Sequence, residues 1–215
     1  MKATVVIPTY NGETYLQAIL TALETQKIDG DFEVLVIDSG STDSTLEIVA
    51  AHPAVRLHQI PNSEFGHGKT RNLAAELATG EFVVYLTHDA IPADDHWLAE
   101  MLEPFEKVPG VEAVMGRQAP RPDCVPILKY EIQRVFSTQG PEFGTTVFYE
   151  TPAFDRRPEY VMPARFYSDV NSAARRSFLT EMIPYQDVAY AEDQLFGQDV
   201  LAAGKSKAYA SRGTV

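Results

Sequence analysis

Val83-Val84-Tyr85-Leu86-Thr87-His88-Asp89-Ala90 is the stretch that decides the fold. Its first four residues are apolar, which is typical of a buried parallel strand. The run then breaks into a polar triplet that carries one carboxylate, Asp89. Open α/β sheets bind their ligands at the carboxyl ends of such strands. We therefore expect Asp89 to bind a divalent metal ion that in turn holds a diphosphate.

Strand and helix signals alternate around this stretch up to residue 116. β-Branched and apolar runs predict strands at residues 4–7, 32–37, 55–60, 81–86 and 111–115, and apolar residues at helical spacing predict helices at residues 13–26, 44–51, 69–79 and 95–107. This alternation predicts an α/β fold with a mostly parallel sheet flanked by helices. Polar residues at three strand ends should then converge at one edge of the sheet: Thr9, Tyr10 and Asn11, then Asp38, then Thr87, His88 and Asp89.

The second half of the chain has a less regular pattern. Helices are expected at residues 127–136 and 192–203, a short strand at residues 171–174, and a final strand that begins at residues 208–210. No regular structure is predicted for residues 138–162. The 215 residues fit one domain, with a ligand-binding half at residues 1–116 and an irregular half at residues 117–215.

Composition narrows the class of protein. The net charge of −12 disfavours non-specific nucleic-acid binding. Cys124 is the only cysteine, so an intramolecular disulfide is impossible and a reducing compartment fits. No apolar run is long enough to cross a bilayer, and no signal-peptide core is present. We expect a cytoplasmic protein. Peripheral contact with the inner face of the membrane is compatible with this sequence.

Two further features bear on the ligand. Pro8-Thr9-Tyr10-Asn11-Gly12 follows the first predicted strand in place of a G-x-G-x-x-G motif, which disfavours a dinucleotide oxidoreductase. Lys69 and Arg71 lie at the start of a predicted helix, where cations oppose the helix dipole unless an anion is bound. A helix start with free N–H groups and two cations predicts a phosphate site.

The motifs in order resemble a known family. V-V-I-P-T-Y-N-G, V-L-V-I-D-S-G-S-T-D-S-T, G-K-T-R-N-L-A and Y-L-T-H-D-A resemble the family 2 glycosyltransferases with the GT-A fold. The variants E-F-G-H-G-K-T-R-N-L-A and L-T-H-D-A-x-P most resemble the bacterial rhamnosyltransferase branch. The likeness covers roughly the first hundred residues and returns near residue 192.

The resemblance implies a nucleotide site. It assigns nucleotide binding to Pro8, Thr9, Tyr10, Asn11, Asp38, Lys69, Arg71 and His88. Asp38 would accept a hydrogen bond from the imide of the base, because a pyrimidine N–H needs an acceptor. Tyr10 would pack on the ring, since an aromatic face suits a flat base. His67 is a further candidate for contact with the donor.

The resemblance also implies a metal site and a catalytic base. Asp89 matches the second Asp of the family's D-x-D motif and would bind Mg²⁺ or Mn²⁺, with Thr87 where the first Asp would stand. Asp193, in Tyr190-Ala191-Glu192-Asp193, would take the proton from the acceptor hydroxyl in an inverting transfer. Asp169, Asn171 and Glu192 would face the donor sugar or the acceptor. Within the single domain, residues 1–116 would then form the nucleotide-sugar-binding half and residues 117–215 the acceptor-binding and catalytic half.

The expected function is therefore transfer of a sugar, rhamnose by resemblance, from a dTDP- or UDP-sugar to a cell-surface polysaccharide or lipid-linked acceptor. Two alternatives stay open: a sugar-nucleotide pyrophosphorylase, and a degenerate nucleotide-sugar-binding module without turnover. The family usually has a histidine after its last strand, and this chain ends at Val215 without one. We expect either a piece of a longer protein or an impaired metal site.

Overall fold

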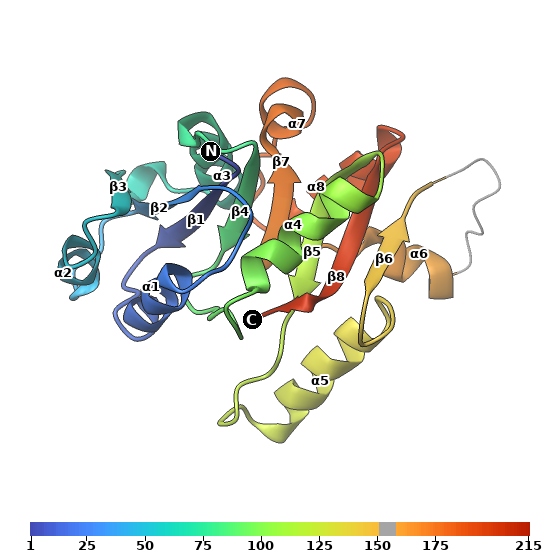
Figure 1. Cartoon of the computed structure of the whole chain (residues 1–215), viewed down its shortest axis with the longest axis horizontal. Helices are drawn as coiled ribbons and strands as arrows, with labels where there is room; N and C mark the ends of the chain where they lie inside the picture. Colours follow the sequence, from blue (N-terminus) through green and yellow to red (C-terminus); the bar gives the residue numbers. More distant parts are fainter. Residues whose placement is uncertain (151–157) are drawn as a thin grey trace.

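The computed structural model describes residues 1–150 and 158–215. Within them, one sheet has the strand order β3-β2-β1-β4-β7-β5-β8-β6 (Figure 1). The strands are β1 (Ala3–Thr9), β2 (Phe32–Asp38), β3 (Val55–Gln59), β4 (Phe82–Leu86), β5 (Val111–Arg117), β6 (Thr145–Phe148), β7 (Asn171–Arg175) and β8 (Ser206–Thr214).

The sheet is mostly parallel, as the alternating pattern predicts. β1 pairs in parallel with both β2 and β4, β2 pairs with β3, and β5 pairs with β8. β7 runs antiparallel between β4 and β5, and β6 closes the far edge antiparallel to β8. β7 therefore begins at the edge where β4 and β5 end.

Helices cover both faces of the sheet (Figure 1). They are α1 (Leu16–Glu24), α2 (Thr45–Ala50), α3 (His67–Leu77), α4 (Trp97–Lys107), α5 (Pro126–Ser137), α6 (Pro158–Arg165), α7 (Arg176–Glu181) and α8 (Glu192–Ala202), with a 3-10 turn η1 (Asn62–Glu64). Buried side chains of α1, α2 and α4 pack on one face, and those of α3, α5, α7 and α8 pack on the other.

β4 shows why its apolar run forms a central strand. Val84 and Leu86 enter the core under α1 and α4, whereas Val83 and Tyr85 enter the core under α3 and α8. All four side chains are buried, because successive residues of a strand point to opposite faces and both faces are covered. The polar residues that follow β4 then lie at the carboxyl edge of the sheet.

The structure corrects the second half of the sequence prediction. The stretch expected to be irregular holds β6 and the start of α6, and α7 was not predicted. β6 has only four residues and α6 contains Pro163, so neither has a strong local pattern. The rest of that stretch, residues 151–157, lies outside the described residues. No helix in the described ranges is long and apolar enough to cross a membrane.

Candidate active site

A cavity of about 240 Å³ lies at the carboxyl edge of the sheet, between the ends of β1 and β4 and the start of α3. Its lining residues are Pro8, Thr9, Tyr10, Phe65, His67, Thr70, Arg71, Thr87, His88 and Asp89. Six residues predicted to bind nucleotide or metal are among them: Pro8, Thr9, Tyr10, Arg71, His88 and Asp89. Asn11, Asp38 and Lys69 are not among the lining residues.

Two aromatic side chains form part of this cavity. Tyr10 follows β1 and is 47% exposed, and Phe65 precedes α3 and is 37% exposed. Exposed aromatic faces are unfavourable in water and suit a flat ligand. Phe65, which the sequence analysis did not select, also contacts the ring of His67 edge-on at 5.1 Å between centroids. Its sequence signal was its place in E-F-G-H-G-K-T-R-N-L-A, a motif variant that carries the family resemblance.

The Asp38 carboxylate is buried, and both of its oxygens accept hydrogen bonds from the protein. One oxygen accepts hydrogen bonds from the hydroxyls of Thr9 (3.0 Å) and Ser41, and the other accepts from the backbone N–H groups of Gly40 and Ser41, each at 3.0 Å. The residue therefore holds the turn after β2, and a base imide would have to displace one of these donors. Asn11 joins the same turn, because its side-chain oxygen accepts from the N–H of Thr42 at 2.9 Å.

Asp89 is the exposed carboxylate of the cavity. The Thr87 hydroxyl donates to its Oδ1 at 2.7 Å, so the residue at the first D-x-D position contacts the second. Arg121, which the sequence analysis missed, donates to the Asp89 carbonyl and lies 3.9 Å above the Tyr15 ring. One carboxylate with open space beside it fits a cation that keeps water and phosphate oxygens in its shell.

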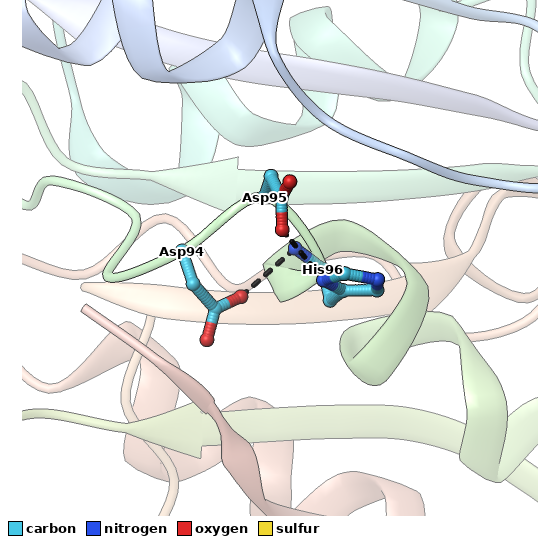
Figure 2. Close-up of side chains that lie close together, drawn as sticks. All are labelled: Asp94, Asp95 and His96. Atoms are coloured by element: carbon cyan, nitrogen blue, oxygen red, sulfur yellow. Dashed lines mark hydrogen bonds and ion pairs between the residues drawn. The ribbon is translucent and has the colours of Figure 1, made fainter.

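A second acidic group lies at the start of α4, outside this cavity. Asp94, Asp95 and His96 have ligand atoms within 4.8 Å of one another, and no other such group of three occurs in the described residues (Figure 2). These side chains already have partners. Asp95 is paired with Lys27 and with His96 Nδ1, and Asp94 accepts from the His96 backbone at 2.8 Å. We assign no metal role to this group.

Arg71 is buried between carboxylates from the second half of the chain. Its Nε lies 2.9 Å from Asp169 Oδ2, and its Nη1 lies 2.6 Å from Glu192 Oε1. With two carboxylates on one guanidinium, Arg71 is not the free phosphate-binding cation that the sequence predicts. Lys69 is exposed and lies 3.3 Å from Asp187.

The G-K-T-R-N motif joins the two halves of the chain. Gly68 lies so close to the Gln186 carbonyl that a Cβ there would overlap it. Asn72 exchanges two hydrogen bonds of 2.9 Å with the backbone of Tyr185. Together with the Arg71–Glu192 pair, these contacts fasten the start of α3 to the segment that leads into α8. Thr70, between them, lines the cavity, and its hydroxyl is buried without a hydrogen-bond partner among the described residues.

Both carboxylate oxygens of Asp169 have partners within the protein. Its Oδ1 accepts from the hydroxyls of Ser172 (2.6 Å) and Tyr185 (2.9 Å), and its Oδ2 faces Arg71. Burial raises the pKa of Asp169 to about 6, although Arg71 opposes the shift. Its backbone N–H points to Asp193 Oδ2 at 3.4 Å, so Asp169 lies directly beside the predicted base.

Asp193 is half-buried in the first turn of α8, next in sequence to Glu192, which pairs with Arg71 of the cavity wall. Its Oδ1 accepts from the Gln194 backbone at 2.7 Å. Burial is the main cause that raises its pKa, and the neighbouring Glu192 charge adds to the shift. Ala191, just before the helix, has φ +61°, a strained conformation of the kind that clusters at functional sites.

Asn171 has a different role from the one predicted. Its side chain is buried at the start of β7, where Oδ1 accepts from the Trp97 indole at 3.0 Å and Nδ2 donates to the carbonyls of Gly213 and Arg117. Both ends of the amide are therefore used to tie β7 to α4, β5 and β8. We leave Asn171 out of the site because its side chain is fully buried and its amide is hydrogen-bonded within the protein.

Comparison with known proteins adds to this geometry. The family model for glycosyl transferase family 2 matches residues 4–182. The chain is 30% identical, over 217 aligned residues, to the O-antigen chain rhamnosyltransferase RfbN of Salmonella typhimurium. That alignment covers 100% of this chain and 66% of RfbN, so the chain spans just under two thirds of this relative.

Solved structures share the fold. TarS 1-349 of Staphylococcus aureus, in complex with UDP, superposes with a TM-score of 0.71 at 26% identity over 100% of this chain and 61% of TarS. The mannosyltransferase PcManGT of Pyrobaculum calidifontis, solved with GDP-Man and Mn²⁺, gives a TM-score of 0.70 at 23% identity over 99% of this chain and 55% of its own. The GT-A fold and the likeness to the rhamnosyltransferase branch are thereby confirmed. The chain belongs to glycosyl transferase family 2.

Proposed function

We propose that this chain carries the catalytic domain of an inverting glycosyltransferase that uses a nucleoside-diphosphate sugar. One observation carries the proposal: six predicted ligand-binding residues line one cavity, and Arg71 in its wall is ion-paired to Glu192 and Asp169, which both lie beside Asp193. Tyr10 and Phe65 supply aromatic faces for a base, and Asp89 supplies a carboxylate for a metal.

In the proposed reaction, the oxygen of an acceptor hydroxyl attacks the anomeric carbon of the donor sugar. Its proton passes to the Asp193 carboxylate, the bond from the anomeric carbon to the diphosphate oxygen breaks, and a nucleoside diphosphate leaves. Attack from the face opposite the leaving group inverts the anomeric configuration. The raised pKa of Asp193 makes it a stronger base than an ordinary aspartate.

We infer a divalent metal, Mg²⁺ or Mn²⁺, held by Asp89. The Thr87 hydroxyl orients this carboxylate, and His88 lies in the same cavity wall. A single carboxylate suits a cation that takes its other oxygens from water and diphosphate. Such a metal supplies positive charge that stabilises the leaving diphosphate.

The proposed donor and acceptor rest on likeness to a related protein. RfbN acts as an O-antigen chain rhamnosyltransferase, so dTDP-rhamnose is the donor that we propose, with a UDP-sugar as the other candidate. The acceptor would be a growing cell-surface polysaccharide or a lipid-linked precursor. We place the protein in the cytoplasm, which its lone Cys124 fits, and at the inner membrane face if the acceptor is lipid-linked.

Titration calorimetry with dTDP and with UDP, each with and without Mn²⁺, tests this proposal. Asp89→Ala should abolish the metal dependence of nucleotide binding. Asp94→Ala is the matched control, because Asp94 is an exposed aspartate of the acidic group outside the cavity. Failure of both nucleotides to bind would contradict the proposal.

Turnover needs a separate measurement. Asp193→Asn should abolish transfer while nucleotide affinity stays close to that of the parent chain, because Asp193 lies outside the cavity lining. Asp187→Asn, an exposed aspartate before α8, is the control. If Asp193→Asn lowers affinity and transfer in parallel, Asp193 is structural.

A nucleotide-sugar-binding module without turnover is the second candidate. Thr87 in place of the first D-x-D carboxylate favours it, because the site then offers the metal one carboxylate only. Metal-dependent binding with no transfer to any acceptor would select this candidate. The pyrophosphorylase alternative finds no support in the family match.

A further inference from the structure

One side chain of the loop between β5 and α5 contacts the backbone of Asp89. The half-buried Arg121 guanidinium donates through Nη2 to the Asp89 carbonyl, and its Cζ lies 3.9 Å from the centre of the Tyr15 ring. Arg121 is 32 positions away from Asp89 in the sequence and is not among the residues that line the cavity. It therefore reaches the proposed metal-binding residue from outside the cavity.

The carbonyl that Arg121 contacts belongs to a peptide unit that is held at both ends. Its oxygen, from Asp89, accepts from Arg121, and its N–H, from Ala90, donates to the Thr87 carbonyl at 3.0 Å. Because a peptide unit is planar, these two hydrogen bonds together fix the backbone direction after Asp89. The Thr87 hydroxyl holds Asp89 Oδ1 at 2.7 Å. The position of the carboxylate thus depends partly on Thr87 and partly on Arg121.

Arg121 is itself supported by its loop and by α1. Its carbonyl accepts from the Cys124 N–H at 3.1 Å, and Ala119, at the start of the loop, donates to the Val215 carbonyl at 2.7 Å. The Tyr15 ring below the guanidinium directly precedes α1 and packs against the core. A planar guanidinium stacks well on an aromatic face, so this ring fixes the direction in which Arg121 points.

Orientation matters at this site because the protein offers the metal few ligands. Among the described residues that line the cavity, Asp89 is the one carboxylate, and Thr87 stands where the D-x-D motif has another. Binding of a divalent cation by a single carboxylate depends on how well that group is placed. Replacing a residue that orients a metal ligand commonly lowers metal affinity by about 10–100-fold.

We propose that Arg121 is a positioning residue for the metal site, and that it fixes the Asp89 backbone so that the carboxylate points to the cation. The proposal rests on the proposed function, in which Asp89 holds the metal. The charge of Arg121 acts in the opposite direction, because a cation beside a metal site repels the metal. The sign of the change in metal affinity therefore separates positioning from charge.

Mn²⁺ binding to the chain without nucleotide tests the proposal. Bound Mn²⁺ broadens the NMR signals of nearby backbone amides, so the amides of Asp89 and Ala90 report occupancy of this site even when binding is weak. Broadening that is lost in Asp89→Ala defines binding at Asp89. Its dependence on Mn²⁺ concentration gives the affinity.

Arg121→Met should weaken Mn²⁺ binding at Asp89 about tenfold, because the carbonyl loses its donor. Arg121→Lys keeps the charge and a donor and should recover part of the affinity. Tyr15→Leu leaves every charge in place and should weaken binding in the same direction. Arg134→Met removes an exposed arginine of α5 and is the matched control, which should bind Mn²⁺ like the parent chain.

Three results would overturn the proposal. The first is equal Mn²⁺ affinity in the parent chain and in Arg121→Met. The second is tighter binding in Arg121→Met, because the charge of Arg121 would then outweigh any positioning effect. The third is the absence of Mn²⁺ broadening that depends on Asp89.

UDP and dTDP affinities measured on the same samples separate this proposal from the proposed function. Without metal, Arg121→Met should bind UDP like the parent chain. A loss of metal-free UDP affinity with Mn²⁺ affinity unchanged would mean that Arg121 contacts the diphosphate directly, which overturns the positioning role.

The two proposals can fail independently. Mn²⁺ binding that responds to Arg121→Met in a chain that binds neither nucleotide would keep the positioning role and reject the transferase. Normal metal-dependent nucleotide binding with a Mn²⁺ affinity that is indifferent to Arg121→Met would reject the positioning role alone.

Discussion

The Arg71 guanidinium carries one positive charge between two buried carboxylates, Asp169 and Glu192. Burial opposes its charge, but the carboxylates and surrounding tyrosines keep the pKa of Arg71 above its usual value. Removing one partner of such a cluster leaves the others charged and desolvated. The residue is thus a structural link between the cavity wall and the neighbours of Asp193.

We expect Arg71→Met to destabilise the protein by about 3–5 kcal/mol, since Asp169 and Glu192 lose their shared cation. Arg71→Lys should be intermediate, because a lysine cannot make the two-pronged contact. Urea unfolding measures the loss of stability in both variants. Lys69 is an exposed cation nearby, so Lys69→Ala should lower the free energy of unfolding by about 1 kcal/mol or less. Unfolding free energies that match for Arg71→Met and Lys69→Ala would contradict this role.

The pH dependence of transfer should report the Asp193 environment. A general base works only when deprotonated, so activity should fall as pH falls through its pKa. Because burial raises the pKa of Asp193, the acidic limb of kcat/KM should lie above the ordinary aspartate value of about 3.9. Nucleotide affinity measured over the same pH range separates loss of the base from loss of the donor. An acidic limb at or below the ordinary value would show that Asp193 is not the titrating base.

At the scale of elements, the start of α3 is the contact that assembles the site. Gly68 allows the helix to approach the backbone at Gln186, and Asn72 pairs with the backbone at Tyr185. The motif that the sequence analysis treated as a phosphate site is, in the structure, mainly a helix-to-segment junction. His67 and Thr70 of this helix start still line the cavity wall.

Gly68→Ala should destabilise the fold by about 1–3 kcal/mol, because the added methyl group forces α3 away from the Gln186 carbonyl. Gly66→Ala is the matched control. Gly66 has an extended φ of −160°, and its nearest neighbours would lie 3.4 Å or more from the new Cβ. Chemical denaturation of both variants measures the difference. Equal unfolding free energies would mean that the junction yields without cost.

At the scale of the whole molecule, one sheet unites the two halves of the chain. β4 and β5 come from the first half and do not pair with each other, since β7 of the second half lies between them. The division near residue 116 therefore stays a hypothesis about ligand roles. It does not mark two separate structural units.

We expect a fragment of residues 1–117 not to fold cooperatively. Without β7, β5 has no strand to join it to β4, and the central strand β4 is left with an open edge. Circular dichroism during urea titration should show a broad, shallow change for the fragment and a sigmoidal transition for the full chain. A sharp transition for the fragment would show that the first half is an independent unit.

The strand and helix order of residues 1–117 was predictable because it depends on local periodicity. The apolar run of β4 needs no distant partner to be recognised, and polar residues after parallel strands must share one edge. This is why Tyr10, His88 and Asp89 were correctly grouped. β6 and α7 escaped prediction because they are four and six residues long and take their form from the neighbours they pack on.

The sequence by itself determined the family motifs, the mostly parallel sheet and the edge at which the polar residues meet. Only the tertiary structure decided which of those residues are free to meet a ligand. Arg71 is neutralised by Glu192, a residue 121 positions away, and Asp38 is enclosed by the turn that it holds. Charge pairing and enclosure depend on distances in space, and a linear pattern of residue types does not record them.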